Sequence, residues 1–208
     1  AVPVQGGHLQ LPAYQSATWQ AALRSMIIAL GQRYAADDRV SHVVIGIGLD
    51  GESQAYRSDY EAQAQAALGA DYRTAFDKYA LATLGWHRKA LPSKPLYAAV
   101  NPGGQGLRKQ LIRKMLDLNI GYKNCGLAPD WPTAWSYNDC MYVGGNYGLW
   151  APMRDLQGKL PIWLESVSGV VNAESVYWSL LLGLSWRPCG IDLHREWFAA
   201  NPEQIRWA

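Results

Sequence analysis

The chain has 208 residues, enough for one domain with a full apolar core, and its formal net charge is only +2. Its basic residues are scattered, which argues against nucleic acid or an anionic membrane as a partner, and its apolar runs are too short to span a bilayer. No signal peptide is visible and the chain does not begin with Met, so we expect either a removed signal, as in a secreted or extracytoplasmic protein, or a longer N-terminal part.

Short β-like runs alternate along the chain with runs of helical period, a pattern typical of βα units with a parallel sheet. The β-like runs predict six strands, at residues 2–5, 41–49, 96–100, 120–124, 160–165 and 190–194. The helical periodicity predicts helices over residues 16–30, 72–89, 107–118 and 173–184, with Ser16 as an N-cap and a last helix beginning at Pro202. We see no linker, so residues 1–208 are expected to form a single domain.

Residues 127–156 form a long irregular segment between the fourth and fifth predicted strands. It is rich in Trp, Tyr, Gly, Pro and Asn, and a loop of this length in a compact domain is usually functional. Trp and Tyr are abundant in the whole chain, at 10 and 12 residues against 2 Phe, and their flat faces with polar edges suit sugars as well as an aromatic core. We therefore take Trp131, Trp135 and Trp150 of this loop as candidate substrate-binding residues.

The cysteines and histidines give no metal-ligand pattern. Cys125, Cys140 and Cys189 are expected to be free, with a single bridge among them left open, and the four His have no ligand spacing. No metal or organic cofactor is expected.

Six βα units fall short of the eight that a closed barrel needs. An open doubly wound sheet is the alternative, but it normally has a Gly-rich phosphate turn after its first strand, and Gly6-Gly7-His8 lacks that spacing. We expect an α/β fold of the (β/α)8 TIM-barrel type, incomplete, with about six units.

Two glutamates follow apolar runs at positions where a barrel carries its chemistry. Glu52 is expected to end the second predicted strand and Glu165 the fifth, and the carboxyl ends of the strands form the active face of a barrel. Asp50, two residues before Glu52, would share its face of an extended strand, either beside the catalytic acid or paired with an Arg. A retaining glycosidase needs two such carboxyls about 5 Å apart, one as acid/base and one as nucleophile.

The segments 29–34 (ALGQRY) and 43–52 (VVIGIGLDGE) resemble the third helix and fourth strand of a clan of barrel glycosidases (clan A type), and 160–166 (LPIWLES) resembles its seventh strand. In this clan the acid/base glutamate ends strand four and the nucleophile glutamate ends strand seven. If Glu52 lies on strand four, the six predicted strands become strands three to eight, and Glu165 then falls on strand seven.

The resemblance implies roles for several residues of this chain. Glu52 would be the acid/base and Glu165 the nucleophile. Trp197 would form the floor under the sugar, and Tyr122 would hydrogen-bond the nucleophile. Asn101 and His8, each at a strand end, would be sugar contacts. Gly51 stands where many clan members carry Asn, so another residue would have to contact the sugar 2-hydroxyl.

The sequence therefore predicts a retaining glycoside hydrolase that cleaves O-glycosidic bonds of a carbohydrate substrate by double displacement. The alternative is a non-catalytic carbohydrate-binding barrel. Because strands one and two are not found, the missing N-terminal part of the barrel is an expected partner.

Overall fold

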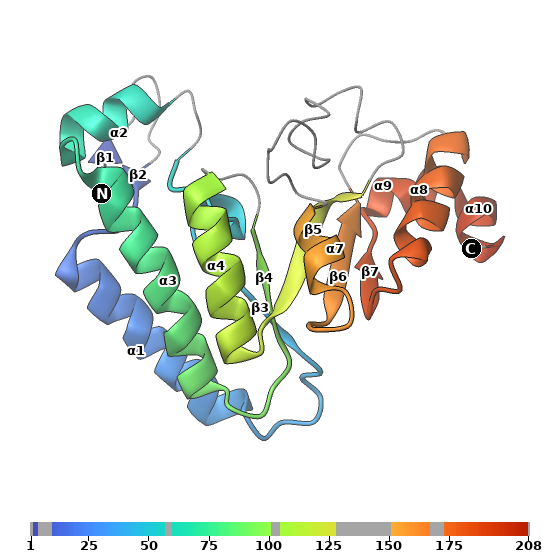
Figure 1. Ribbon diagram of the computed structural model, residues 1–208, viewed down its shortest axis with the longest axis horizontal. Coiled ribbons are helices and arrows are strands. Elements are labelled where there is room, and N and C mark those ends of the chain that lie inside the picture. Colours follow the sequence, from blue (N-terminus) through green and yellow to red (C-terminus); the bar gives the residue numbers. More distant parts are fainter. Residues whose placement is uncertain are drawn as a thin grey trace.

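The computed structural model describes residues 2–3, 10–56, 60–100, 105–127, 151–166 and 173–207. They form a mixed α/β structure with a curled, all-parallel half-barrel sheet of five strands (Figure 1). The strands are β3 (Val43–Ile45), β4 (Leu96–Ala99), β5 (Gly121–Leu127), β6 (Ile162–Ser166) and β7 (Gly190–Asp192), and they pair in the order of the sequence. Within the described part, this order lacks the reversal that a doubly wound sheet requires.

The helices confirm most of the predicted helical periods. They are α1 (Ala17–Tyr34), η1 (Leu49–Gly51), α2 (Glu61–Leu68), α3 (Tyr72–Ala90), α4 (Gln105–Leu118), α7 (Ala151–Leu156), α8 (Ala173–Ser185), α9 (Arg195–Ala200) and α10 (Pro202–Trp207). Figure 1 shows α1 and α3 towards one end of the long axis, α8 and α10 towards the other, and the sheet between them. In the described residues we find no helix with the length and apolar character that crossing a bilayer would require.

Helix α1 begins at its predicted cap and ends later than expected. The Ser16 side chain accepts a hydrogen bond from the Trp19 backbone N–H at 3.4 Å. The helix was predicted over residues 16–30, but α1 continues through Gly31 to Tyr34. A Cβ at Gly31 would lie 2.3 Å from the carbonyl oxygen of Ala90, so this glycine permits the close packing of α1 against α3.

The first β-like run does not belong to the parallel sheet. Residues Val2–Pro3 form β1, which pairs antiparallel with β2 (Gln10–Leu11) in a separate two-stranded sheet. The prediction that this run begins the parallel sheet is therefore wrong. Pro3 has no N–H to donate to a ladder, which suits a short edge strand rather than a sheet interior.

The second β-like run is interrupted by its glycines. Strand β3 ends at Ile45, and the chain then folds back on itself, with the Gly48 N–H donating to the Glu52 carbonyl at 2.7 Å. Leu49–Gly51 is a turn of 3-10 helix, and Gly51 has a positive φ of 81°. Glu52 thus caps a tight turn instead of ending a strand, and Asp50 does not share a strand face with it.

One face of the parallel sheet is packed on helices and forms the main core. Ile45, Ala98, Tyr122 and Leu164 lie on this face and are buried. The helical side chains that complete the core come from α3, α4 and α7, and include Phe76, Leu84, Leu111, Met115, Met153 and Leu156. Arg108 of α4 is also buried.

The opposite face, here called the inner face, carries an aromatic layer near the start of the strands. The ring centroids of His42 and Trp163 lie 4.3 Å apart, and those of Tyr97 and Trp163 lie 5.3 Å apart. Tyr97 lies over Gly121 of the next strand, and Trp163 lies over Gly190: a Cβ at these glycines would be 2.5 Å and 2.4 Å from the respective ring atoms. Burial, together with the neighbouring Cys189 thiol, raises the pKa of Tyr97 to about 12.

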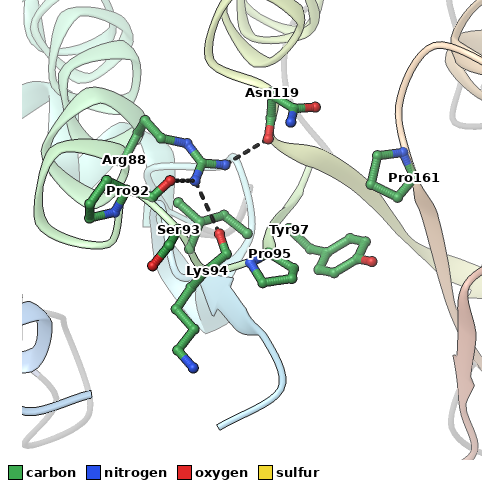
Figure 2. Close-up of a pocket in the computed structure, with 9 residues that line it drawn as sticks. Arg88, Pro92, Ser93, Lys94, Pro95, Tyr97, Asn119 and Pro161 are labelled. Atoms are coloured by element: carbon green, nitrogen blue, oxygen red, sulfur yellow. Dashed lines mark hydrogen bonds between the residues drawn. The ribbon is translucent and has the colours of Figure 1, made fainter. Parts of the chain in front are cut away.

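A cavity of about 400 Å³ lies near the amino ends of β4 and β6, and Arg88 of α3 spans it (Figure 2). The Arg88 guanidinium donates to the backbone carbonyls of Leu118 at 2.8 Å and Asn119 at 2.6 Å, and to those of Leu91, Pro92 and Lys94 at 3.0–3.2 Å. Arg88 therefore holds the α3–β4 and α4–β5 connections together. In barrels the side at the amino ends of the strands generally serves stability, whereas the side at their carboxyl ends carries the catalytic groups.

The variant Arg88→Ala should lower the free energy of unfolding by about 2–3 kcal/mol, because several carbonyls lose a charged donor. Urea denaturation measures the change. The neighbouring Lys89 is exposed, so Lys89→Ala should stay within about 0.5 kcal/mol of the parent. Equal effects of the two substitutions would contradict a structural role for Arg88.

A methyl group at Gly121 should destabilise the sheet by about 1–3 kcal/mol, because the Tyr97 ring already occupies that space. The matched control is Gly85→Ala in α3, where no neighbouring atom lies within 4 Å of the added Cβ. That change should stabilise the protein by about 0.5–1 kcal/mol, as Ala does in helix interiors. Thermal denaturation should show opposite signs for the two variants.

His87 should make the stability depend on pH. Burial lowers its pKa, while its contact with the Thr83 carbonyl at 2.9 Å acts in the opposite direction. Since an unfolded His titrates near about 6.5, the unfolded chain takes up the proton first, and stability present above that pH is lost as the pH falls through the lower folded value. Between pH 7 and 5, the unfolding free energy should fall more steeply for the parent than for His87→Phe; parallel slopes would contradict this assignment.

Candidate functional site

Charged side chains from three adjacent strands gather on the inner face, toward the carboxyl ends of β6 and β7. Lys123 of β5 lies between Glu165 of β6 and Asp192 of β7. Its ammonium Nζ is 2.6 Å from Glu165 Oε2 and 2.9 Å from Asp192 Oδ2. The strand register produces this grouping, because Lys123 pairs with Trp163 while Glu165 pairs with Asp192, and all four side chains share one face.

Lys123 is the most enclosed member of this cluster. Its side chain is 11% exposed, against 28% for Glu165 and 46% for Asp192. Burial acts to lower the pKa of Lys123, but hydrogen bonds and attraction from Asp192 and Glu165 outweigh it, and the pKa is raised. The lysine is therefore held as an ammonium between two carboxylates.

Cys125 lies near this cluster, and its pKa also depends on Glu52, the predicted acid/base. It lies two residues beyond Lys123 on β5, and its thiol donates a hydrogen bond to the Glu165 carboxylate. Burial is the main cause that raises the pKa of Cys125, and the charges of Glu165 and Glu52 raise it further. The raised pKa of Cys125 thus has contributions from both predicted catalytic carboxylates.

Glu52 lies in the turn that follows β3. It is the C-cap of η1, with φ −91° and ψ 178°, and its side chain is partly buried. The Gln54 amide donates to Glu52 Oε2 at 3.1 Å, which helps to orient the carboxylate. The tight turn, rather than an extended strand, therefore sets the position of this residue.

His194 lies on the other side of Glu165. It is the N-cap residue of α9, and its Nε2 lies 3.7 Å from Glu165 Oε1. Its backbone N–H donates to the Ser166 hydroxyl at 2.9 Å, which ties the start of α9 to the end of β6. His194 and Lys123 thus approach different oxygens of the same carboxylate.

Tyr122 does not lie where the sequence predicted. It was expected to hydrogen-bond Glu165, but it pairs with Ile162 and lies fully buried on the helix-packed face of the sheet. Glu165 lies on the inner face, so the predicted contact is wrong. Lys123, the next residue of the strand, takes the place that we assigned to Tyr122.

Trp197 is also placed in a core. It is fully buried in a second cluster with Val176 and Leu180 of α8, against which Leu193 and Ile205 pack. A side chain without exposed surface does not offer a floor to a sugar, so we assign Trp197 a packing role.

The remaining predicted contacts fall outside the described residues. These are His8, Asn101, Trp131, Trp135 and Trp150; for Asp50 only the backbone is described. Cys125 and Cys189 are free, as expected, and Cys140 again falls outside. Across the described segments, no three His, Cys, Asp or Glu side chains are grouped so that they could hold a metal ion.

Sequence reasoning missed Lys123 and did not connect Asp192 or His194 with Glu165. The available signal was Lys123 within a predicted strand, because a buried ammonium is costly without a carboxylate partner. The identity of the partner depends on the strand register, which the sequence alone does not reveal.

We compared the chain with known protein families, with curated proteins and with solved structures, and none of the three comparisons found a match.

Proposed function

We propose that this chain is the catalytic part of a retaining glycoside hydrolase on an incomplete (β/α) barrel of the TIM type. Glu165 is the nucleophile and Glu52 the acid/base. The observation that carries the proposal is the position of Glu165 near the carboxyl end of β6 in a curled parallel sheet, where the Lys123 ammonium lies 2.6 Å from one carboxylate oxygen and His194 Nε2 lies 3.7 Å from the other. The carboxyl ends of the strands are where barrel enzymes carry their catalytic groups.

Each of the two carboxylates is oriented by a neighbouring side chain. Glu165 Oε2 lies 2.6 Å from the Lys123 ammonium, and the Gln54 amide donates to Glu52 Oε2 at 3.1 Å. A nucleophile and an acid/base must both be held in position to act on one glycosidic bond.

The reaction proceeds in two displacements. A Glu165 carboxylate oxygen attacks the anomeric carbon and the glycosidic C–O bond breaks, while Glu52 gives its proton to the departing oxygen. Glu52 then takes a proton from water, and that water attacks the same carbon and releases Glu165. Two inversions leave the configuration retained.

A non-catalytic carbohydrate-binding barrel is the second candidate. It is favoured by the ion pairs of Lys123, since a carboxylate fully engaged in a structural network need not be reactive. The two readings differ in the separation of the Glu52 and Glu165 carboxyls: about 5 Å suits retention, and a separation beyond about 9.5 Å suits neither hydrolytic mechanism.

The variant Glu165→Ala should lose turnover of aryl glycosides by at least about a thousandfold, because the covalent intermediate no longer forms. Added azide should restore cleavage and give a glycosyl azide of inverted configuration, since the small anion attacks from the vacated side. Product configuration is read by proton NMR.

Glu52→Ala should slow substrates with poor leaving groups far more than those with activated leaving groups, which need no proton. Glu174→Ala is the matched control, because Glu174 is an exposed glutamate on α8. Full activity in Glu165→Ala, or equal losses in the Glu174 control, would remove the assignment.

A further inference from the structure

We propose that Lys123 is the positioning residue of this site: clamped by Asp192, its ammonium holds the Glu165 carboxylate in its reactive orientation. The inference rests on the proposed function, because it assigns Lys123 a role in preparing the nucleophile.

The geometry ties the three residues to rigid elements. Lys123 comes from β5, and its two partners come from β6 and β7, the next strands in the sheet. Its Nζ lies 2.6 Å from Glu165 Oε2 and 2.9 Å from Asp192 Oδ2, so the two carboxylates hold the ammonium between them. Side chains on strands are positioned more precisely than side chains on loops, and the ion pair therefore restricts rotation of the Glu165 carboxylate.

The charge balance explains why the lysine needs two partners. Before reaction, Lys123 offsets the repulsion between Glu165 and Asp192. When Glu165 becomes an ester to the sugar, it loses its negative charge, and a lysine with no other partner would remain buried and uncompensated. Asp192 keeps the ammonium paired at that stage, so Lys123 favours the ionised nucleophile without opposing the intermediate.

The groups that face Glu165 in the described residues come from several elements. Lys123 and Cys125 come from β5, Asp192 from β7 and His194 from the start of α9, and the charge of Glu52 contributes to the raised pKa of Cys125. Of these groups, Lys123 alone carries a fixed positive charge. Its removal leaves the Glu165 carboxylate beside that of Asp192, where one of the two should hold a proton more readily.

The test compares kcat, KM and the pH dependence of kcat/KM for Lys123→Met, Lys123→Arg and Asp192→Asn. Lys123→Met should lower kcat by about a hundredfold or more while KM changes less than about threefold, because the loss falls on the transition state. The acid limb of its kcat/KM profile should move to higher pH by about one unit, since the carboxylate ionises less readily. Lys123→Arg should restore much of kcat and bring the acid limb back towards that of the parent, because it keeps the positive charge.

Asp192→Asn keeps the lysine and removes the competing carboxylate, so its acid limb should move to lower pH, opposite to Lys123→Met. It also provides the test if Lys123→Met proves unfolded by circular dichroism. Lys159→Met, on an exposed lysine, is the control and should match the parent. Acid limbs that stay in place in all variants, or move in the same direction in Lys123→Met and Asp192→Asn, would overturn the role.

A readout that does not need activity separates this inference from the proposed function. The carboxyl ¹³C signal of Glu165, assigned with Glu165→Gln, should show its midpoint of protonation at higher pH in Lys123→Met than in the parent. A parent protein that hydrolyses no glycoside in a panel overturns the proposed function. An unchanged Glu165 titration overturns the role of Lys123, even in an active enzyme.

Discussion

The ion pairs of a nearly buried lysine, Lys123, with Glu165 and Asp192 are the constraint on which the candidate site depends. Taking an ammonium out of water costs several kcal/mol unless carboxylates and hydrogen bonds offset it. The two carboxylates come from the next two strands, so the same contacts that stabilise the charge also connect β5 with β6 and β7. The contacts that arrange the site therefore also help to hold these three strands in register.

The inner face is layered along the strand direction. Near the start of the strands, His42, Tyr97 and Trp163 pack ring against ring. Lys123 pairs with Trp163, and Glu165 and Asp192 lie two residues further along their strands. The aromatic rings therefore adjoin the charged cluster and limit water on one side of it, which strengthens the interaction of the carboxylates with the ammonium.

Much of this fold follows from periodicity. The helix at α3 and the strand at β4 match the prediction closely, because each has a long buried face and clear ends. The predicted strand at 41–49 was too long, since an apolar run broken by Gly46 and Gly48 has the composition of a strand but the conformation of a turn. The position of Glu165 at a strand end was predictable, whereas the turn that carries Glu52 was not.

The site was harder to predict than the elements. The sequence of a single strand does not tell which alternate set of its residues points into a site. Tyr122 was assigned to the site through the family resemblance, whereas the adjacent Lys123 is the residue on the inner face. Trp197 shows a related limit: an aromatic residue after the last strand suits either a sugar or a core, and the packing of α8, α9 and α10 around it decides.

The contacts of Tyr97 with Gly121 and of Trp163 with Gly190 also bear on how the strands find their partners. A slip of one residue exchanges the two faces of a strand, and the apolar pattern opposes it. A slip of two residues preserves the faces, and hydrophobicity alone does not oppose it. Such a shift would bring Asn119 or Lys123 under the Tyr97 ring, and Pro188 or Asp192 under the Trp163 ring, where the structure has room only for glycine. The ring–glycine pairs therefore oppose the two-residue misalignments that burial alone would tolerate, and they do so through shape and not through charge.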